Sequence, residues 1–150
     1  MNKNRTYHEH GDANSTKQSE GSEPNTTLEE DEIANCIDPD HEDWRLREIK
    51  RLNDQLRETG EGGTIVVTPG FLDLSYELRE QILNAMQRED QFTQDNDPWG
   101  EHDMGSVNIE GNTVLWKIDT YDLDMNYLSP EPADPNVTKR VLTIMLASEY

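Results

Sequence analysis

The sequence holds a single cysteine, Cys36, among its 150 residues. No disulfide can form within the chain, so a small secreted module stapled by disulfides is excluded. The first residues contain no apolar run of the kind found in signal peptides, and no later run approaches the length of a membrane span. A cytoplasmic location is therefore the expectation.

Positive charge is also scarce, because 13 Lys and Arg stand against 32 Asp and Glu, for a formal net charge of −19. The imbalance is not confined to one end, since residues 43–150 carry 21 acids and 10 bases. A field of this sign repels nucleic-acid phosphates and anionic lipid surfaces, so direct binding to nucleic acid or to a membrane is not expected. The same field attracts a protein with a basic surface.

Large apolar side chains are sparse before position 43, where Asn, Ser, Thr, Glu and Asp dominate. A segment of this composition cannot bury enough surface to offset the entropy lost on ordering. We therefore expect residues 1–42 to form a disordered acidic tail. Residues 43–150 have a length that suits one domain with one core.

Residues 43–60 have the pattern of an amphipathic helix, because apolar side chains recur at three- and four-residue steps from Leu46 through Ile49 and Leu52 to Leu56. The other positions of this helix hold five bases: Arg45, Arg47, Lys50, Arg51 and Arg57. They either pair with neighbouring acids or form a basic stripe that binds a partner.

A short β-branched strand is predicted at residues 64–67, closed by Pro69 and Gly70. A second helix should follow, with Asp73 or Ser75 as its N-cap. Its buried face is predicted to hold four apolar residues: Leu78, Ile82, Ala85 and Met86.

The rest of the chain has the alternation of β-strands. Residues 107–118 predict a hairpin that turns at Gly111 and Asn112 and has one buried face. A proline-rich connection and then a continuous apolar run at 141–146 follow, the run being typical of a central strand covered on both faces. The order of elements predicts an α+β fold, a small antiparallel sheet with two helices packed on one side.

The densest polar chemistry lies in the loop of residues 95–105, which holds four acids and the one histidine after position 42. Carboxylates and imidazole together suit a divalent metal such as Mn, Fe or Zn. A calcium-loop pattern fails, since Trp99 and Ser106 stand where that motif needs ligands. The candidate metal ligands are Asp95, Asp97, Glu101, His102 and Asp103.

Two other interpretations of this loop remain open. In the structural one, Asp95 and Asn96 make Asx turns, Pro98 and Gly100 set the bend, and His102 hydrogen-bonds a carboxylate. In the other, the loop recognises a partner, as functional loops often do.

A row of side chains on the exposed face of the hairpin offers further catalytic candidates. Lys117, Asp119 and Tyr121 recur at period two and therefore share one face. With His102, a lysine beside carboxylates can serve acid/base chemistry. The alternative for the row is a cross-strand ion pair on a solvated face.

Several strings between about Leu52 and Tyr150 carry a family likeness: Asp95–Pro98, Glu101–Asp103, Gly105, Trp116–Asp119, Tyr121–Asp122, Asp134–Pro135, Arg140–Ala147 and Glu149–Tyr150. In them the chain resembles an uncharacterised bacterial family, the domain of unknown function three-seven-six-eight, often carried on plasmids and other mobile elements. Met104 and Thr120 depart from the family pattern, in which aromatic residues are usual. The resemblance implies a mobile-element setting and no particular activity.

The leading hypothesis is an acidic interaction protein of a plasmid or phage, which engages a basic surface of a host nucleic-acid-binding or defence protein. The alternative is a small enzyme, metal-dependent or acid/base, centred on the loop that holds Asp95, His102 and Asp103. In that alternative the cofactor is a divalent metal. Surface binding needs carboxylates spread over an exposed face, whereas catalysis needs them to converge in a pocket.

Overall fold

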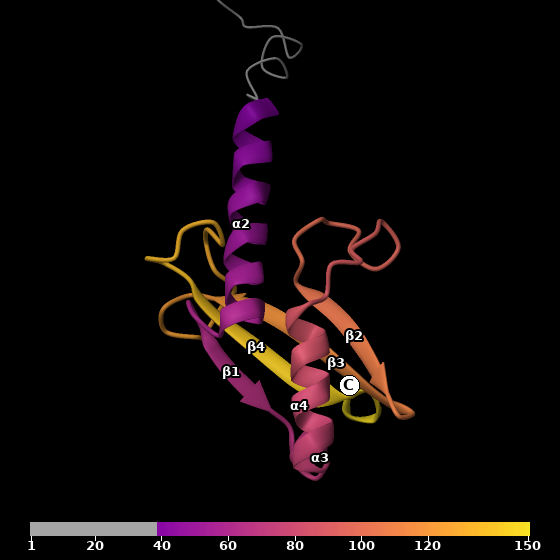
Figure 1. Cartoon of the computed structure of the whole chain (residues 1–150). Coiled ribbons are helices and arrows are strands. Elements are labelled where there is room, and N and C mark those ends of the chain that lie inside the picture. Colours follow the sequence, from indigo (N-terminus) through magenta and orange to yellow (C-terminus); the bar gives the residue numbers. More distant parts are fainter. Residues whose placement is uncertain (1–38) are drawn as a thin grey trace, which may run out of the picture. The chain divides into compact units, whose positions relative to one another are not determined.

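The structure is a computed structural model that describes residues 39–150 (Figure 1). The predicted tail of residues 1–42 lies outside the described residues except at its end, because the first helix begins at Pro39 rather than at Asp43. The elements are α2 (Pro39–Thr59), β1 (Thr64–Val67), α3 (Pro69–Leu72), α4 (Tyr76–Gln87), β2 (Met104–Ile109), β3 (Asn112–Tyr121), β4 (Lys139–Leu146) and the 3-10 turn η2 (Ala147–Glu149).

The four strands form one mixed sheet in the order β1-β4-β3-β2, and α2 and α4 cover one of its faces (Figure 1). The prediction of an α+β fold with helices on one side is confirmed. The expected antiparallel pairing holds for β2 with β3 and for β3 with β4, but β1 pairs in parallel with β4. The reason is the crossover through α4, after which β2 runs in the same direction as β1. Strands β3 and β4 each reverse direction in turn, so β4 is again parallel to β1.

Helix α2 turns its apolar stripe to the sheet, as its periodicity predicts. Ile49, Leu52 and Leu56 are buried, while Leu46, nearer the start of the helix, is 36% exposed. The helix ends at Thr59, just before Gly60, whose φ of +76° is a conformation that glycine adopts without strain. The predicted end near Gly60 is therefore confirmed.

Most bases of α2 are engaged with acids rather than free for a partner. Arg57 is buried, so it does not belong to the outer face of the helix. Three exposed or half-exposed arginines make ion pairs: Arg45 with Glu131, Arg47 with Asp43, and Arg51 with Glu48. For these arginines the pairing interpretation of the basic stripe is confirmed.

Helix α4 begins as the sequence predicts, with Ser75 as N-cap, because the Ser75 hydroxyl accepts a hydrogen bond from the backbone N–H of Leu78 at 3.2 Å. Its buried residues are Leu78, Ile82 and Met86, and Ala85 is half-buried.

The hairpin of β2 and β3 turns one residue earlier than predicted. Ile109 pairs with Asn112, which leaves Glu110 and Gly111 as the two turn residues, with φ of +51° and +79°. Both positive values match the tight turn that suits the twist of a hairpin, in which glycine is favoured.

Strand β4 lies between β1 and β3 and is therefore the central strand that its apolar run predicts. The core between the sheet and the helices is built around fully buried Trp116 and includes Leu56, Phe71, Leu78, Ile82, Met86, Val107, Val114, Ile118, Leu142 and Ile144. Among the described residues, no helix has the length and apolar character needed to cross a membrane.

Candidate functional site

The segment between α4 and β2, residues 88–103, which we call the 88–103 loop, contains most of the loop that the sequence singles out. It is held together by hydrogen bonds among its own residues. The carboxylate of Asp97 is buried and accepts hydrogen bonds from the backbone N–H groups of Glu101, at 3.1 Å, and His102, at 3.2 Å. The side chain of Asn96 accepts from the backbone N–H of Thr93 at 2.6 Å. Gly100, with φ of +67°, sets the bend. The loop is thus held by internal hydrogen bonds, as the structural interpretation expects, but through longer-range contacts of Asp97 and Asn96 rather than through Asx turns at Asp95 and Asn96.

His102 lies inside this arrangement rather than at its surface. Its Nδ1 is 2.8 Å from Oδ1 of Asp54, a residue of α2, and its Nε2 is 3.8 Å from Oδ2 of Asp97. The ring stacks on Phe92 with centroids 3.6 Å apart and planes at 13°, and only 13% of the side chain is exposed. The imidazole therefore joins the loop to α2 between two carboxylates and an aromatic ring.

Arg57 carries the connection from α2 to the end of α4. Its guanidinium donates to the backbone carbonyls of Met86, at 2.7 Å, and Gln87, at 3.1 Å, and to Oδ1 of Asp54 at 3.0 Å. The carbonyls of a last helical turn have no partner within the helix, and a cation there is also favoured by the helix dipole. The guanidinium carbon lies 5.5 Å from the ring centroid of Phe92, within the range of a cation–π contact.

Asn53 forms the third link between α2 and its surroundings. Its side-chain amide donates to the backbone carbonyl of Glu101 at 2.9 Å and accepts from Nε of Arg140 at 2.9 Å. Arg140 also donates to the backbone carbonyl of Pro132, in the connection between β3 and β4. Burial lowers the pKa of the Arg140 guanidinium. One turn of α2 therefore holds both long connections of the fold.

The candidate metal ligands do not converge on one point. Asp95 is exposed, Asp97 is used by backbone N–H groups, and His102 takes its closest carboxylate from Asp54, which is not among the candidates. Burial raises the pKa of Glu101, and the negative charge of Asp103 adds to this effect. Burial likewise raises the pKa of Asp103. Within residues 39–150, no group of three or more His, Cys, Asp or Glu side chains is placed to hold a metal ion.

The catalytic candidates divide between two places. Lys117, Asp119 and Tyr121 lie half-buried on the sheet face opposite the helices, as their period predicts, and Lys117 donates from Nζ to Oδ1 of Asp119 at 2.5 Å. This hydrogen bond raises the pKa of Lys117. The partners of His102 are Asp54, Asp97 and Phe92, so the structure does not bring His102 to Asp119. The expected cross-strand ion pair is therefore wrong, because Lys117 and Asp119 pair along β3, two residues apart.

Sequence reasoning missed the three polar residues of α2 that hold the site, Asn53, Asp54 and Arg57. A signal was present, because Asn53 and Arg57 are four residues apart and flank the buried stripe next to Leu56. Polar side chains at the edge of a buried stripe need partners when they become buried.

It also missed an ordered turn in the connection between β3 and β4, residues 122–128, which we call the 122–128 turn. Tyr121 and Leu128 bridge across it, and the backbone N–H of Asp122 donates to the carbonyl of Tyr127 at 2.9 Å. The turn thus reverses the chain directly after β3. It exposes four large apolar side chains: Leu123 at 50%, Met125 at 48%, Tyr127 at 77% and Leu128 at 76%.

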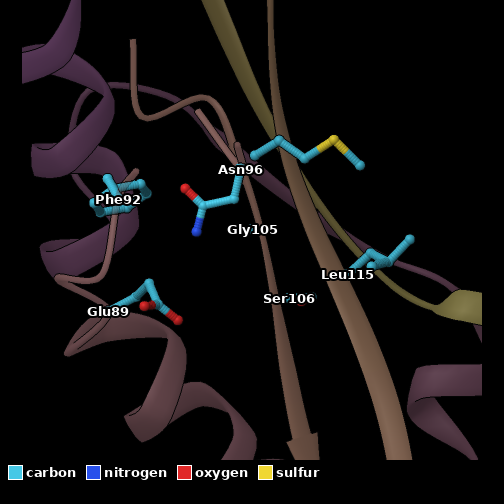
Figure 2. Close-up of a pocket in the computed structure, with 7 residues that line it drawn as sticks. Glu89, Phe92, Asn96, Gly105, Ser106 and Leu115 are labelled. Atoms are coloured by element: carbon cyan, nitrogen blue, oxygen red, sulfur yellow. The ribbon is translucent and has the colours of Figure 1, made fainter. Parts of the chain in front are cut away.

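A cavity of about 220 Å³ lies beside β2 (Figure 2). Figure 2 shows it between the segment that follows α4 and the first half of β2, with Leu115 of β3 behind. Its lining residues are Glu89, Phe92, Asn96, Met104, Gly105, Ser106 and Leu115. It shares Phe92 with the His102 stack but is not lined by His102 itself.

Comparison with known proteins gives one positive result. A family model described as a protein of unknown function, DUF3768, matches residues 67–149. No curated protein matches the chain, and no solved structure matches it. The matched region runs from the end of β1 to η2, so it contains the 88–103 loop, the 122–128 turn and the cavity but not α2. The match covers more than half of the chain, which therefore belongs to the DUF3768 family.

Proposed function

We propose that this chain is a non-enzymatic binding protein that engages a basic surface of another protein through the 122–128 turn. The observation that carries the proposal is the combination of order and exposure in this turn. Asp122 fixes the turn, because its Oδ1 accepts from the backbone N–H of Asn126 at 2.9 Å and its carbonyl accepts from the backbone N–H of Met125 at 3.1 Å. A backbone that is already ordered in this way loses little entropy on binding.

The composition of the turn suits a binding surface. Tyr127 and Leu128 are each about three-quarters exposed, and contiguous exposed apolar surface on a soluble protein marks interaction sites. Tyrosine is also among the residues that contribute most to binding energy in interfaces. Asp122 precedes the first of these apolar residues and Asp124 follows it, so the turn is both apolar and negative.

The charge of the chain supports a basic partner. Besides the arginines of α2, Lys117 is paired within the chain, to Asp119. These bases each face an acid of the chain, whereas Asp124 is exposed and Asp122 is half-buried on the turn. A basic protein surface is attracted and steered by such a field. In the mobile-element setting that the family resemblance implies, a host nucleic-acid-binding or defence protein would offer one.

The surroundings of His102 favour binding over catalysis. A general base needs access to the proton that it abstracts. The His102 ring is covered by Phe92 on one face, is held by Asp54 at one nitrogen, and is 13% exposed. Its contacts fasten the loop to α2, and this supports a structural role for the histidine.

The test is capture of partners by the purified full chain from a lysate of the organism that encodes it, followed by affinity measurements with the identified partner. We expect a basic protein. The double variant Tyr127→Ser, Leu128→Ser should weaken its binding at least about tenfold, because exposed aromatic anchors contribute about 2 kcal/mol or more at the centre of interfaces.

The matched control replaces an exposed tyrosine and an exposed leucine elsewhere, Tyr76→Ser with Leu72→Ser, which are 63% and 51% exposed. This control should bind within about twofold of the native chain, as expected of residues outside an interface. Equal loss in both double variants, or a captured partner without a basic surface, would overturn the proposal.

A further inference from the structure

Among residues 39–150, no strand pairs with the outer edge of β2. The strand is last in the sheet, next only to β3. The backbone N–H of Ile118 donates to the carbonyl of Asp103 at 2.7 Å. Asp103 and Ile118 are therefore a hydrogen-bonded pair, and they come just before the pair of Met104 and Lys117. Such pairs alternate along an antiparallel ladder. Residues 105, 107 and 109 therefore direct their backbone groups to β3.

It follows that Met104, Ser106 and Asn108 direct their backbone N–H and C=O groups away from the sheet. No backbone hydrogen bond outside the strand ladder is made by these three residues within the described part of the chain. Exposed edge strands are usually blunted by charged residues, proline or a bulge. Strand β2, Met-Gly-Ser-Val-Asn-Ile, has none of these in its sequence or its pairing. The edge is thus open to a further strand.

The cavity beside β2 lies at the same place. Its lining includes Met104, Gly105 and Ser106 of the strand, with Glu89 and Phe92 across from them (Figure 2). At about 220 Å³ it is smaller than the roughly 300–1,000 Å³ of sites that hold drug-sized ligands. It is suited to one side chain rather than to a small molecule.

We propose that β2 accepts an extended segment of a basic partner protein as a fifth strand, with a lysine or arginine side chain of that segment in the cavity beside Glu89. A residue opposite Gly105 on an added strand has its side chain on the same face as Gly105 and Val107. That face is the one covered by helices, since Val107 is in the core. Glu89 and Phe92 lie there, and the Glu89 carboxylate supplies the negative charge.

Backbone pairing gives affinity in this mode of recognition, and side-chain pockets give specificity. The inference takes the positive charge of the partner from the proposed function but places the contact at β2, away from the 122–128 turn. The two can therefore fail separately.

The experiment uses the full chain, labelled for NMR, and two blocked hexapeptides of alternating threonine and valine that differ only in one central residue, lysine or glutamate. The lysine peptide should shift the amide signals of Met104, Ser106 and Asn108. It should bind at least about tenfold more tightly than the glutamate peptide, because opposite charge attracts at this site and like charge repels. Glu89→Gln should reduce the ratio of the two affinities, because it removes the negative charge beside the cavity.

Ser106→Pro removes one outward N–H without removing a bond to β3, a position where edge strands tolerate proline. This variant should lose peptide binding at least about tenfold, while the control Ser106→Ala, which keeps the N–H, should bind as the native chain does. If Ser106→Pro unfolds, two N-methylated forms of the lysine peptide test the same hydrogen bonds. In an extended peptide alternate N–H groups point to opposite edges, so one form is methylated on one edge and the second form on the other. The form methylated on the edge that faces β2 should lose binding, and the other should keep it.

Any of three results would overturn the inference. These are amide shifts confined to residues outside β2, equal binding of the two peptides, and no shift with the lysine peptide at millimolar concentration. Shifts of the β2 amides that depend on protein concentration without peptide would assign the edge to a second copy instead, and would also overturn it. If the substitutions at Tyr127 and Leu128 abolish capture while the β2 edge ignores peptides, the proposed function stands and this inference falls. The reverse result leaves the edge site and removes the 122–128 turn.

Discussion

Asp54 decides where the 88–103 loop lies, because its carboxylate meets both His102, at 2.8 Å, and Arg57, at 3.0 Å. Arg57 is 2% exposed, so its positive charge is largely removed from water and needs compensation. Asp54 and Glu58 supply negative charge, and the last carbonyls of α4 supply further acceptors. A buried cation with these partners fixes two separate segments at once.

At the same scale, the folded state favours the protonated form of Glu101, because burial raises the pKa of its carboxyl group. Because its pKa is raised, the folded chain holds this proton more tightly than the unfolded chain does. Its contribution to stability is therefore present at low pH and is lost as the pH rises through the ordinary glutamate range to the raised pKa. At pH 7 the ionised Glu101 costs stability.

We predict that Glu101→Gln raises the midpoint of thermal unfolding at pH 7 by a few degrees at most, since a half-exposed charge is screened by solvent. The gain should shrink as the pH falls from the raised pKa to the ordinary glutamate pKa, and it should be absent below that, where the native side chain is neutral in both states. The measurement is a series of melting curves from pH 7 to pH 3.5. Glu61→Gln, at an exposed carboxylate after α2, is the control. A gain that is independent of pH would contradict the assignment.

At the scale of elements, the indole of Trp116 on β3 lies directly over Gly105 on β2, where a larger residue has no room. A Cβ on Gly105 would lie 2.5 Å from Cζ2 of Trp116, which no real contact allows. Trp116 is fully buried beneath α2 and α4, so its indole has no free space into which to move.

We predict that Gly105→Ala destabilises the fold by about 1–3 kcal/mol, as overpacking of a filled core does. In a background of Trp116→Phe, which removes the benzo ring carrying Cζ2, the same substitution should cost clearly less. Urea unfolding of the four proteins of this cycle gives the coupling. The neighbouring Ser106→Ala should change stability little. Additive effects at 105 and 116 would show that the two positions do not meet.

The elements themselves were largely predictable from the sequence, because each one buries a single face. Period-four apolar steps gave α2 and the Ser75-capped α4, and period-two alternation gave the faces of β3. The parallel pairing of β1 was not predictable, since four residues carry no sign of their partner strand. The turn at Glu110 and Gly111 was placed one residue late because Asn112 is also a turn former.

The candidate site was predictable only in part. The loop was recognised by its composition, but the sequence did not predict that Asp97 would accept hydrogen bonds from the backbone N–H groups four and five residues further on. The contact of His102 with Asp54 joins residues 48 positions apart, which local patterns do not encode. The 122–128 turn escaped notice because its apolar residues have no regular period, and only the backbone hydrogen bonds reveal that it is ordered.

At the scale of the whole molecule, negative charge is the dominant property. The acids outnumber the bases by 19, so the chain produces a negative field at long range. Screening lengths are about 10 Å in 0.1 M salt and about 3 Å in 1 M salt, so this field reaches an approaching partner only at low ionic strength. Charge of this kind acts mainly on the association rate.

We predict that the captured partner binds at least about tenfold more weakly in 0.5 M than in 0.05 M salt, with most of the change in the association rate. The double variant Asp122→Asn, Asp124→Asn should bind more slowly at low salt and lose part of the salt dependence. The substitution Asp122→Asn keeps a side-chain oxygen that can accept from the backbone N–H of Asn126, so the turn should persist. The measurement is the association and dissociation rate constants on an immobilised partner over a range of salt concentrations. The control is the double variant Asp73→Asn, Glu77→Gln, which removes the same amount of charge from exposed positions near α3 and α4. Binding that is insensitive to salt, or equal slowing in both charge variants, would contradict a negative contact surface at the 122–128 turn.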